Sequence, residues 1–230
     1  MSNSNRPLAL VIGAGEGLGA SIMNVFHEDG YQVVGFDRSL HKASHKDCVL
    51  KELDCVDQQG VVESMRQTFS EYGAPQVVVL NTAQLTIKPF LETTVNDFEL
   101  AWQSMVLSAF NVMQQALPLM LEQQSGTVIV SGATGGMRGG GNFSAFASAK
   151  FALRGLTQSL AREYQKQGVH IAHVILDGII DTPRSRDLHA LDPAKMMLPA
   201  DIAAEYLHLV KQNPSAWTHE LDLRPHCENF

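Results

Sequence analysis

The sequence predicts an α/β fold in which a doubly wound parallel sheet of about seven strands carries helices on both faces. Short runs rich in valine, isoleucine and leucine alternate with longer helical patterns along the chain, which is typical of successive β-α-β units. The run Val77–Leu80 is apolar at every position, as expected for a strand that helices cover on both sides. The 230 residues contain no repeat, low-complexity stretch or clear linker, so we expect a single domain over residues 1–230.

The individual elements follow from the apolar runs and their periods. The predicted strands are Leu8–Ile12, Gln32–Phe36, Val49–Leu53, Val77–Leu80, Thr127–Val130, His170–Leu176 and Glu220–Leu223. The predicted helices are Leu18–Asp29, Gln58–Tyr72, Val95–Leu121, Phe143–Gln167 and Pro199–Gln212, with a weaker pattern within Ser185–Lys195. The glycine-rich run Gly135–Gly141 is expected to form a loop inside the domain.

The composition argues against several classes of protein. Apolar residues make up 45% of the chain and charged residues 18%, which is typical of a globular protein. The net charge of −7 and the lack of any run of five Lys or Arg argue against a nucleic-acid partner. Cys48, Cys55 and Cys227 lack metal-ligand spacing, so we expect reduced thiols and no metal. The sequence has no signal region and no apolar run approaching about 18 residues, so we expect a cytoplasmic protein without membrane contact.

A glycine-rich turn follows the first predicted strand. Leu18 occupies the last glycine position of the common G-x-G-x-x-G fingerprint, so the spacing is instead Gly13-x-x-x-Gly17-x-Gly19. Glycine lets the backbone approach a pyrophosphate, and the N-terminus of the next helix offers free N–H groups to it. A tight turn required only for packing is the alternative. The dinucleotide-binding interpretation uses Gly13, Gly15, Glu16, Gly17, Leu18 and Gly19.

An acidic residue marks the end of the second predicted strand. Asp37 lies 24 residues after Gly13, where a carboxylate accepts hydrogen bonds from the adenosine ribose and repels a 2′-phosphate. Glu16 adds to this repulsion, whereas Arg38 is able to hold such a phosphate. The pattern favours NAD(H), with NADP(H) as the alternative, and an ordinary turn residue remains a second interpretation of Asp37.

The stretch from Ser144 to Lys150 carries the most specific motif. It resembles the Tyr-x-x-x-Lys signature of the short-chain dehydrogenase/reductase family, with Phe146 in the tyrosine position. The spacing of the glycine turn is similar to that family as well, and the resemblance runs from Leu8 to about Pro225. It implies a Rossmann-type fold, a nicotinamide dinucleotide cofactor and hydride transfer to or from an unknown small-molecule substrate.

The resemblance also implies further cofactor contacts. Asn81 to Gln84 is similar to the family's Asn-Asn-Ala-Gly motif, with Gln84 departing from it. The segment from Asp177 to Thr182 is similar to Pro-Gly-x-x-x-Thr, with Asp177 in place of the proline. In the family the final threonine binds the nicotinamide carboxamide, and the lysine holds the ribose. The implied cofactor residues are Asp54, Cys55, Asn81, Ala83, Lys150, Gly178, Ile180 and Thr182.

The family's catalytic positions are largely lost. Phe146 replaces the tyrosine, Ala133 the serine and Met105 the helix asparagine, so that Lys150 alone is retained. A phenyl ring cannot exchange a proton. We therefore expect ordinary alcohol–ketone interconversion to be very slow, because a positioned general acid contributes about 10²–10⁴-fold.

Nearby polar residues offer replacements. A shift of one residue in register would bring Thr134 or Ser104 into the serine or asparagine position. The hydroxyl of Thr134 is either a proton donor or a loop group bonded to backbone, and Asp177 is either a general base or a turn residue. The stretch from Arg184 to His189 falls where the family places its substrate lid. Arg184 and Arg186 in this stretch either attract an anionic substrate or line a solvated helix face.

Three functions remain open at this stage. The first is an NAD(H)-dependent oxidoreductase with a non-standard proton donor, such as water or a group of the substrate. The second is a catalytically silent protein that binds NAD(P) and acts as a redox sensor or partner-binding module. The third is an isomerisation or elimination with Asp177 as base. The apolar surface of the two long helices, which build the dimer in the family, predicts a homodimer or homotetramer.

Overall fold

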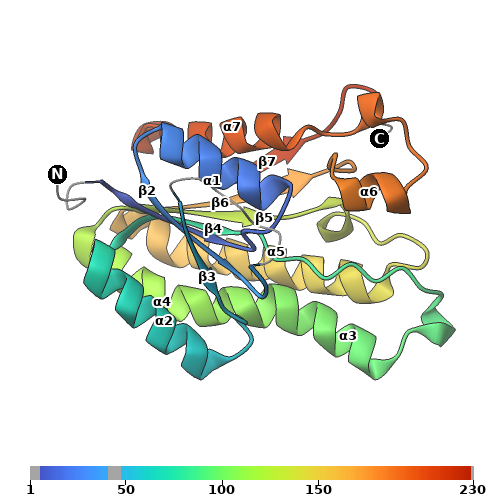
Figure 1. Ribbon diagram of the computed structural model, residues 1–230, viewed down its shortest axis with the longest axis horizontal. Helices are drawn as coiled ribbons and strands as arrows, with labels where there is room; N and C mark the ends of the chain where they lie inside the picture. The colour runs from blue at the N-terminus through green and yellow to red at the C-terminus, as the bar shows by residue number, and fades with distance from the viewer. Residues whose placement is uncertain (1–5, 41–47, 229–230) are drawn as a thin grey trace.

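The computed structural model describes residues 6–40 and 48–228 (Figure 1). Their strands form one seven-stranded parallel sheet in the order β3-β2-β1-β4-β5-β6-β7, which confirms the predicted fold class. The chain starts at the middle of the sheet, extends to one edge and then crosses to the other side. This reversal between β1 and β4 creates the crevice in which ligands bind in such folds. The strands are β1 Leu8–Ile12, β2 Gln32–Asp37, β3 Val49–Glu52, β4 Pro75–Leu80, β5 Gly126–Ser131, β6 Val169–Leu176 and β7 Glu220–Leu223.

Helices cover both faces of the sheet (Figure 1). On one face α1 packs against α7, above a core cluster that contains Phe26 and Tyr206. On the other face α2, α4 and α5 cover a second cluster, and α3 packs against α5. The α-helices are α1 Leu18–Glu28, α2 Gln58–Tyr72, α3 Val95–Trp102, α4 Ser108–Gln123, α5 Ser144–Tyr164, α6 Pro183–Leu188 and α7 Pro199–Val210.

The predicted helix Val95–Leu121 is not a single α-helix. A π-helical turn, Gln103–Leu107, separates α3 from α4. The hydroxyl of Ser108 donates to the carbonyl oxygen of Gln103 at 3.1 Å, within this irregular turn. Such π-turns are rare and often occur at functional sites. Apolar periodicity could not reveal this one, because a single inserted residue leaves the apolar stripe nearly intact.

Other helical predictions need correction at their ends: α1 ends at Glu28 instead of Asp29, and α7 ends at Val210 instead of Gln212. The helix predicted from Phe143 begins at Ser144, because Phe143 adopts non-helical backbone angles as the N-cap. Its last three predicted residues form a 3-10 turn, Gln165–Gln167, ahead of Gly168 at φ 88°. The weak helical pattern within Ser185–Lys195 resolves into α6, a short loop and the 3-10 turn Pro193–Lys195.

One helical stretch in the described part of the chain is long and apolar enough to cross a membrane. Residues Val95–Gln123 span 29 positions, with a mean hydropathy of 1.2 in the most apolar window. The sequence pattern did not predict this stretch, because polar residues interrupt its apolar runs. In that window 61% of the residues are buried inside the protein, as expected for a core helix.

Candidate functional site

The glycine-rich turn lies at the carboxyl end of β1, between β2 and β4. Gly17 is the N-cap of α1 and has a φ of 89°, a backbone angle that residues other than glycine rarely adopt. A Cβ on Gly19 would lie 2.3 Å from the carbonyl oxygen of Gly13, so only glycine fits there. The N-terminus of α1 carries no acidic residue in its first turn and points its free N–H groups at this crevice. Residues 13–19 therefore have the backbone shape that a pyrophosphate-binding turn requires, and this segment is named the phosphate turn for the role that its motif implies.

A buried chain of hydrogen bonds supports the turn from the α7 side. The hydroxyl of Ser131 donates to Oδ1 of Asn81 at 2.9 Å, so the Tyr206 hydroxyl, 2.7 Å from Ser131, is its donor. Nδ2 of Asn81 then donates to the carbonyl oxygen of Gly13 at 3.0 Å. Sequence reasoning assigned Asn81 to the site but missed Ser131 and Tyr206. No periodic signal could have shown that a helix-α7 hydroxyl meets the end of β5.

Asp37 lies beside the phosphate turn. Its Oδ2 would be 3.1 Å from a Cβ on Gly15, and its Oδ1 accepts a hydrogen bond from the Ser39 backbone at 3.3 Å. The side chains of Glu16 and Arg38 are exposed at the same end of the sheet. The carboxylate is thus positioned where an adenosine ribose would follow a pyrophosphate bound at the turn.

The segment after β3 contains Asp54 and Cys55, which the resemblance assigns to the adenine of the cofactor. Asp54 is exposed and accepts a hydrogen bond from the backbone of Val56 at 3.1 Å. Asn111 of α4 donates to the carbonyl oxygens of Cys55 and Val56 at 3.0 and 3.3 Å, which fixes this segment against α4. Burial raises the pKa of the Cys55 thiol to about 12, so this cysteine is not a nucleophile.

The segment after β6 closes the other side of the phosphate turn. A Cβ on Gly17 would lie 2.6 Å from the methyl carbon of Thr182, so the two segments are in direct contact. Thr182 is the N-cap of α6, and its hydroxyl accepts the N–H of Ser185 at 3.1 Å. Gly178 and Ile180 are half-buried in this segment, and Ile180 forms an isolated bridge with Met197. A cofactor on the turn would therefore touch this segment as well.

Lys150 is retained in the position that the family motif requires. Its Nζ donates to the carbonyl oxygen of Ser131 at 2.8 Å, and the residue is only 3% exposed. Burial lowers the pKa of this ammonium group to about 8. The Phe146 ring lies 5.8 Å from Nζ, and its edge is 3.0 Å from where a Gly135 Cβ would be. Phe146 thus fills the space between the lysine and the Thr134–Gly136 turn without offering a hydroxyl.

The two residues that the resemblance assigns to the asparagine and serine positions also lack a polar side-chain group. Met105 is fully buried within the π-turn, and Ala133 directly precedes the 3-10 turn Thr134–Gly136. Ser104, the neighbour considered for the asparagine position, is buried as well. Ala83 is exposed at the end of β4.

The polar centre of this crevice is instead formed by Thr134 and Asp177. The hydroxyl of Thr134 donates to Oδ1 of Asp177 at 2.5 Å, so the expectation that it bonds to backbone is wrong. Asp177 is 1% exposed, with Arg138 at 3.3 Å from Oδ1 and Arg224 at 3.5 Å from Oδ2. Arg224 also pairs with Asp222. Two guanidinium groups therefore compensate the buried carboxylate.

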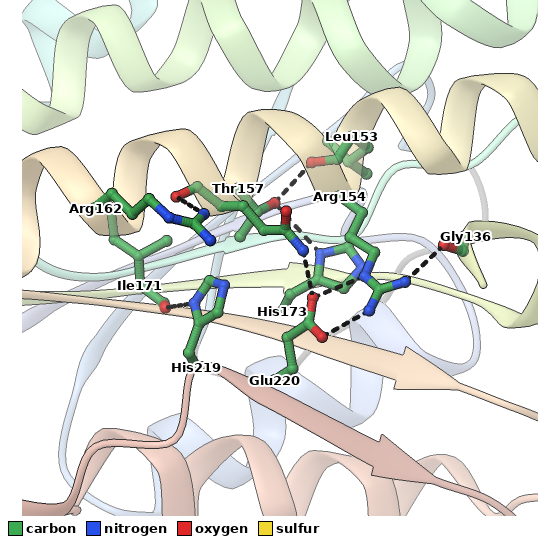
Figure 2. Close-up of polar contacts among 10 residues, drawn as sticks. Gly136, Leu153, Arg154, Thr157, Arg162, Ile171, His173, His219 and Glu220 are labelled. Atoms are coloured by element: carbon green, nitrogen blue, oxygen red, sulfur yellow. Dashed lines mark hydrogen bonds and ion pairs between the residues drawn. The ribbon is translucent and has the colours of Figure 1, made fainter.

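A second ion pair, between Arg154 and Glu220, contacts the Thr134–Gly136 turn (Figure 2). Arg154 of α5 binds both carboxylate oxygens of Glu220 at 2.7 and 2.8 Å, and it also donates to the carbonyl oxygen of Gly136 at 3.2 Å. The hydrogen bonds from Arg154 lower the pKa of Glu220 to about 2. Arg154 thereby links β7 and α5 to the segment that carries Thr134. Sequence reasoning did not identify this link.

His173 is buried in β6 beside this ion pair (Figure 2). Its Nδ1 lies 3.3 Å from the Thr157 hydroxyl, whereas Nε2 has no hydrogen-bond partner among the described residues. Burial and, to a lesser degree, the charge of Lys150 lower the pKa of His173 to about 4. The imidazole is therefore neutral at physiological pH.

The lid arginines differ in their roles. Arg186 of α6 binds both carboxylate oxygens of Asp181 at 2.6 and 2.7 Å. Arg184 is exposed on the same helix. Both arginines are exposed, but only Arg184 has no carboxylate bound to it among the described residues.

Comparison with known proteins agrees with this geometry. The family model for short chain dehydrogenase matches residues 7–191. An uncharacterised oxidoreductase of Staphylococcus aureus (strain N315) is 28% identical over 95% of this chain and 96% of its own. A short-chain dehydrogenase structure from Rhodopseudomonas palustris shares 30% identity and a TM-score of 0.80, covering 98% of this chain and 100% of its own. An alcohol dehydrogenase structure from Thermococcus sibiricus, complexed with 5-hydroxy-NADP, has a TM-score of 0.87 at 21% identity, covering 98% and 99% of the two chains. The chain therefore belongs to the short chain dehydrogenase family.

Proposed function

We propose that this protein is an NAD(H)-dependent oxidoreductase that oxidises an alcohol, with the Thr134–Asp177 pair in place of the family tyrosine. The observation that carries this proposal is the 2.5 Å hydrogen bond from the Thr134 hydroxyl to a buried carboxylate. Thr134 directly follows Ala133, which holds the serine position, and Gly135 lies against the Phe146 ring. The pair thus lies next to the place where the family's acid–base groups act.

The direction of this hydrogen bond favours alcohol oxidation. Because Thr134 donates its proton to Asp177, its oxygen is free to accept the proton of a substrate hydroxyl. As the alcohol becomes a ketone, its hydroxyl proton passes to Thr134, and the proton of Thr134 passes to Asp177. The nicotinamide, when bound, supplies the hydride acceptor for the C–H bond that breaks. Asp177 then releases its proton to solvent past Arg138, whose side chain is 49% exposed.

The retained residues hold the cofactor. Lys150, Thr182 and the glycine turn fit the ribose, carboxamide and pyrophosphate roles that the family motif implies. Asp37 beside the turn favours NAD(H), because its charge opposes a 2′-phosphate. Phe146 adds an apolar wall over Lys150, which helps exclude water from the reacting atoms. We expect slow turnover, because a carboxylate is a weaker base than the phenolate that it replaces.

The test is an alcohol panel assayed for NAD⁺ reduction with three forms of the protein. Wild type and Thr134→Ser keep the hydroxyl, whereas Thr134→Val removes it and preserves the side-chain shape. We expect Thr134→Val to lose about 10²-fold or more of the turnover rate. NADH affinity, measured by calorimetry, should be equal in all three proteins. Equal turnover by Thr134→Val would refute the relay.

The second candidate is a catalytically silent cofactor-binding protein that acts as a redox sensor or partner-binding module. The side chains of Phe146, Ala133 and Met105 favour it, because none of them transfers a proton. NADH binding without turnover on any member of the panel would select this alternative. Turnover that disappears in Lys150→Ala would exclude it.

We also infer a cytoplasmic homodimer or homotetramer. Trp102, Phe110 and Phe151 are 43%, 44% and 45% exposed, and they lie on the helices α3, α4 and α5 that the family uses for assembly. Large aromatic side chains of this kind contribute strongly to interfaces. Light scattering should give at least twice the 25.1 kDa chain mass.

A further inference from the structure

We infer that the substrate is a short hydroxy acid whose carboxylate binds Arg138 while its hydroxyl meets Thr134. This inference rests on the proposed function and names its substrate class. Its basis is the position of Arg138 on the Thr134–Asp177 pair. Nη2 of Arg138 contacts the same Oδ1 of Asp177 that accepts the Thr134 hydroxyl.

The spacing of these groups selects a small molecule. Because Thr134 Oγ1 and Arg138 Nη2 approach one oxygen at 2.5 and 3.3 Å, they lie less than about 6 Å apart. A ligand that binds both needs a hydroxyl and an anionic group separated by one or two carbons. The 2-hydroxy and 3-hydroxy acids have this spacing. A simple alcohol would leave the guanidinium without a ligand.

Arg138 has donors to spare. A guanidinium carries five N–H groups, and among the described residues the structure records one hydrogen bond from the guanidinium of Arg138, to Asp177. Its side chain is 49% exposed, so solvent and ligand both reach it. A planar fork of this kind binds a carboxylate in a bidentate manner, which a lysine cannot reproduce.

Asp177 does not cancel the attraction of Arg138 for a substrate anion. Arg224 lies 3.5 Å from Oδ2 of Asp177, so a second guanidinium shares the buried negative charge. The Arg224 side chain is 17% exposed, whereas the Arg138 side chain is 49% exposed. The exposed Arg184 on α6 adds positive charge near the same end of the sheet. The half-exposed guanidinium of Arg138 is thus available to an anion in a protein whose net charge is −7.

The experiment measures the binding of hydroxy acids to the NADH-saturated protein by calorimetry. The probes are 2-hydroxybutanoate and 3-hydroxybutanoate, each compared with its neutral amide. We expect the acid of at least one pair to bind ten times more tightly than its amide. Arg138→Gln should abolish this preference, and Arg138→Lys should retain part of it. Arg162→Gln changes an exposed arginine on α5, away from Asp177, and this variant should bind acids and amides as wild type does.

Equal binding of acids and amides by wild type would overturn the inference. A preference that survives in Arg138→Gln, with melting temperature and NADH affinity unchanged, would also overturn it. So would displacement of the acid by inorganic phosphate at equal concentration, because the site would then bind any anion. Failure of the proposed function looks different: the acids bind through Arg138, and no NAD⁺ reduction follows. Oxidation of neutral alcohols without any preference for acids would sink the inference and leave the function intact.

Discussion

The hydroxyl of Thr134 and the carboxylate of Asp177 share a 2.5 Å hydrogen bond, although the two residues are 43 positions apart in the chain. They meet because Thr134 follows β5 and Asp177 follows β6, and these neighbouring strands end at the same edge of the sheet. Asp177 replaces the proline of the family motif, which has no side-chain oxygen. The chain with Phe146 in the implied tyrosine position thus carries a carboxylate beside Thr134.

Restoring the tyrosine should restore carbonyl chemistry in part. We expect Phe146→Tyr to raise NADH-dependent ketone reduction at least about tenfold, because the new hydroxyl would stand near Lys150. Adding Ala133→Ser should increase the rate further. Phe151→Tyr adds the same hydroxyl to α5 outside the Lys150–Phe146 contact, and it should leave the rate of ketone reduction unchanged. Rates indistinguishable from wild type in both Phe146 variants would mean that the cleft no longer accepts a carbonyl at this position.

Asp37 should set the choice of cofactor. Its carboxylate lies beside the phosphate turn at Gly15, so we expect NADH to bind at least about ten times more tightly than NADPH. Asp37→Ser removes the negative charge and leaves Arg38 in place. This substitution should reduce the preference for NADH over NADPH or reverse it. Calorimetric titration with both cofactors measures it. Tighter binding of NADPH by wild type would show that Arg38 dominates.

The hydroxyl of Tyr206 should matter for cofactor affinity although it is fully buried on the α7 side of the sheet. Tyr206→Phe keeps the ring and removes the first donor of the chain through Ser131 and Asn81 to the Gly13 carbonyl. We expect NADH to bind about 3–10 times more weakly, since one hydrogen bond contributes about 0.5–1.5 kcal/mol.

A control separates this effect from general loss of stability. Thr68→Val removes another fully buried hydroxyl, which bonds to the Ser64 carbonyl and lies outside the site. It should lower the melting temperature without changing NADH affinity. If Tyr206→Phe lowers the melting temperature and leaves NADH affinity unchanged, these hydrogen bonds support the fold and not the phosphate turn.

His173 should make the protein less stable in acid. Burial lowers its pKa to about 4 in the folded protein, against about 6.5 in the unfolded chain. Between these values the unfolded state binds more protons, so the free energy of unfolding should rise with pH and level off above pH 6.5. The contribution is on the order of 2–3 kcal/mol. Urea unfolding of His173→Asn should lack this slope, whereas the exposed control His208→Asn should retain it.

Sequence patterns predicted the framework closely and the polar contacts poorly. The bounds of β1, α2 and β7 agree with prediction, because apolar runs and turn residues mark these elements locally. The π-turn Gln103–Leu107 escaped prediction, because a single inserted residue leaves the apolar stripe of the helix nearly intact. The glycine turn and Lys150 were assigned from motifs whose spacing is set by local geometry.

The contacts that define this site depend on tertiary structure. Asp177 was recognised as a departure from the family motif, yet its partners Arg138 and Arg224 come from two other segments. Arg154 and Tyr206 carry no motif and act through residues distant in sequence. Such pairs depend on strand register and side-chain rotamers, which a single sequence does not specify.

The most direct test of the account is the pre-steady-state rate of NADH formation by wild type and Asp177→Asn. The substitution keeps the shape of the side chain and removes the base that accepts the Thr134 proton. With the best alcohol of the panel at saturation, we predict a rate about 10²–10⁴-fold lower in Asp177→Asn. NADH affinity should stay within about twofold of wild type, because the pair does not hold the cofactor. An unchanged rate in Asp177→Asn would contradict the account.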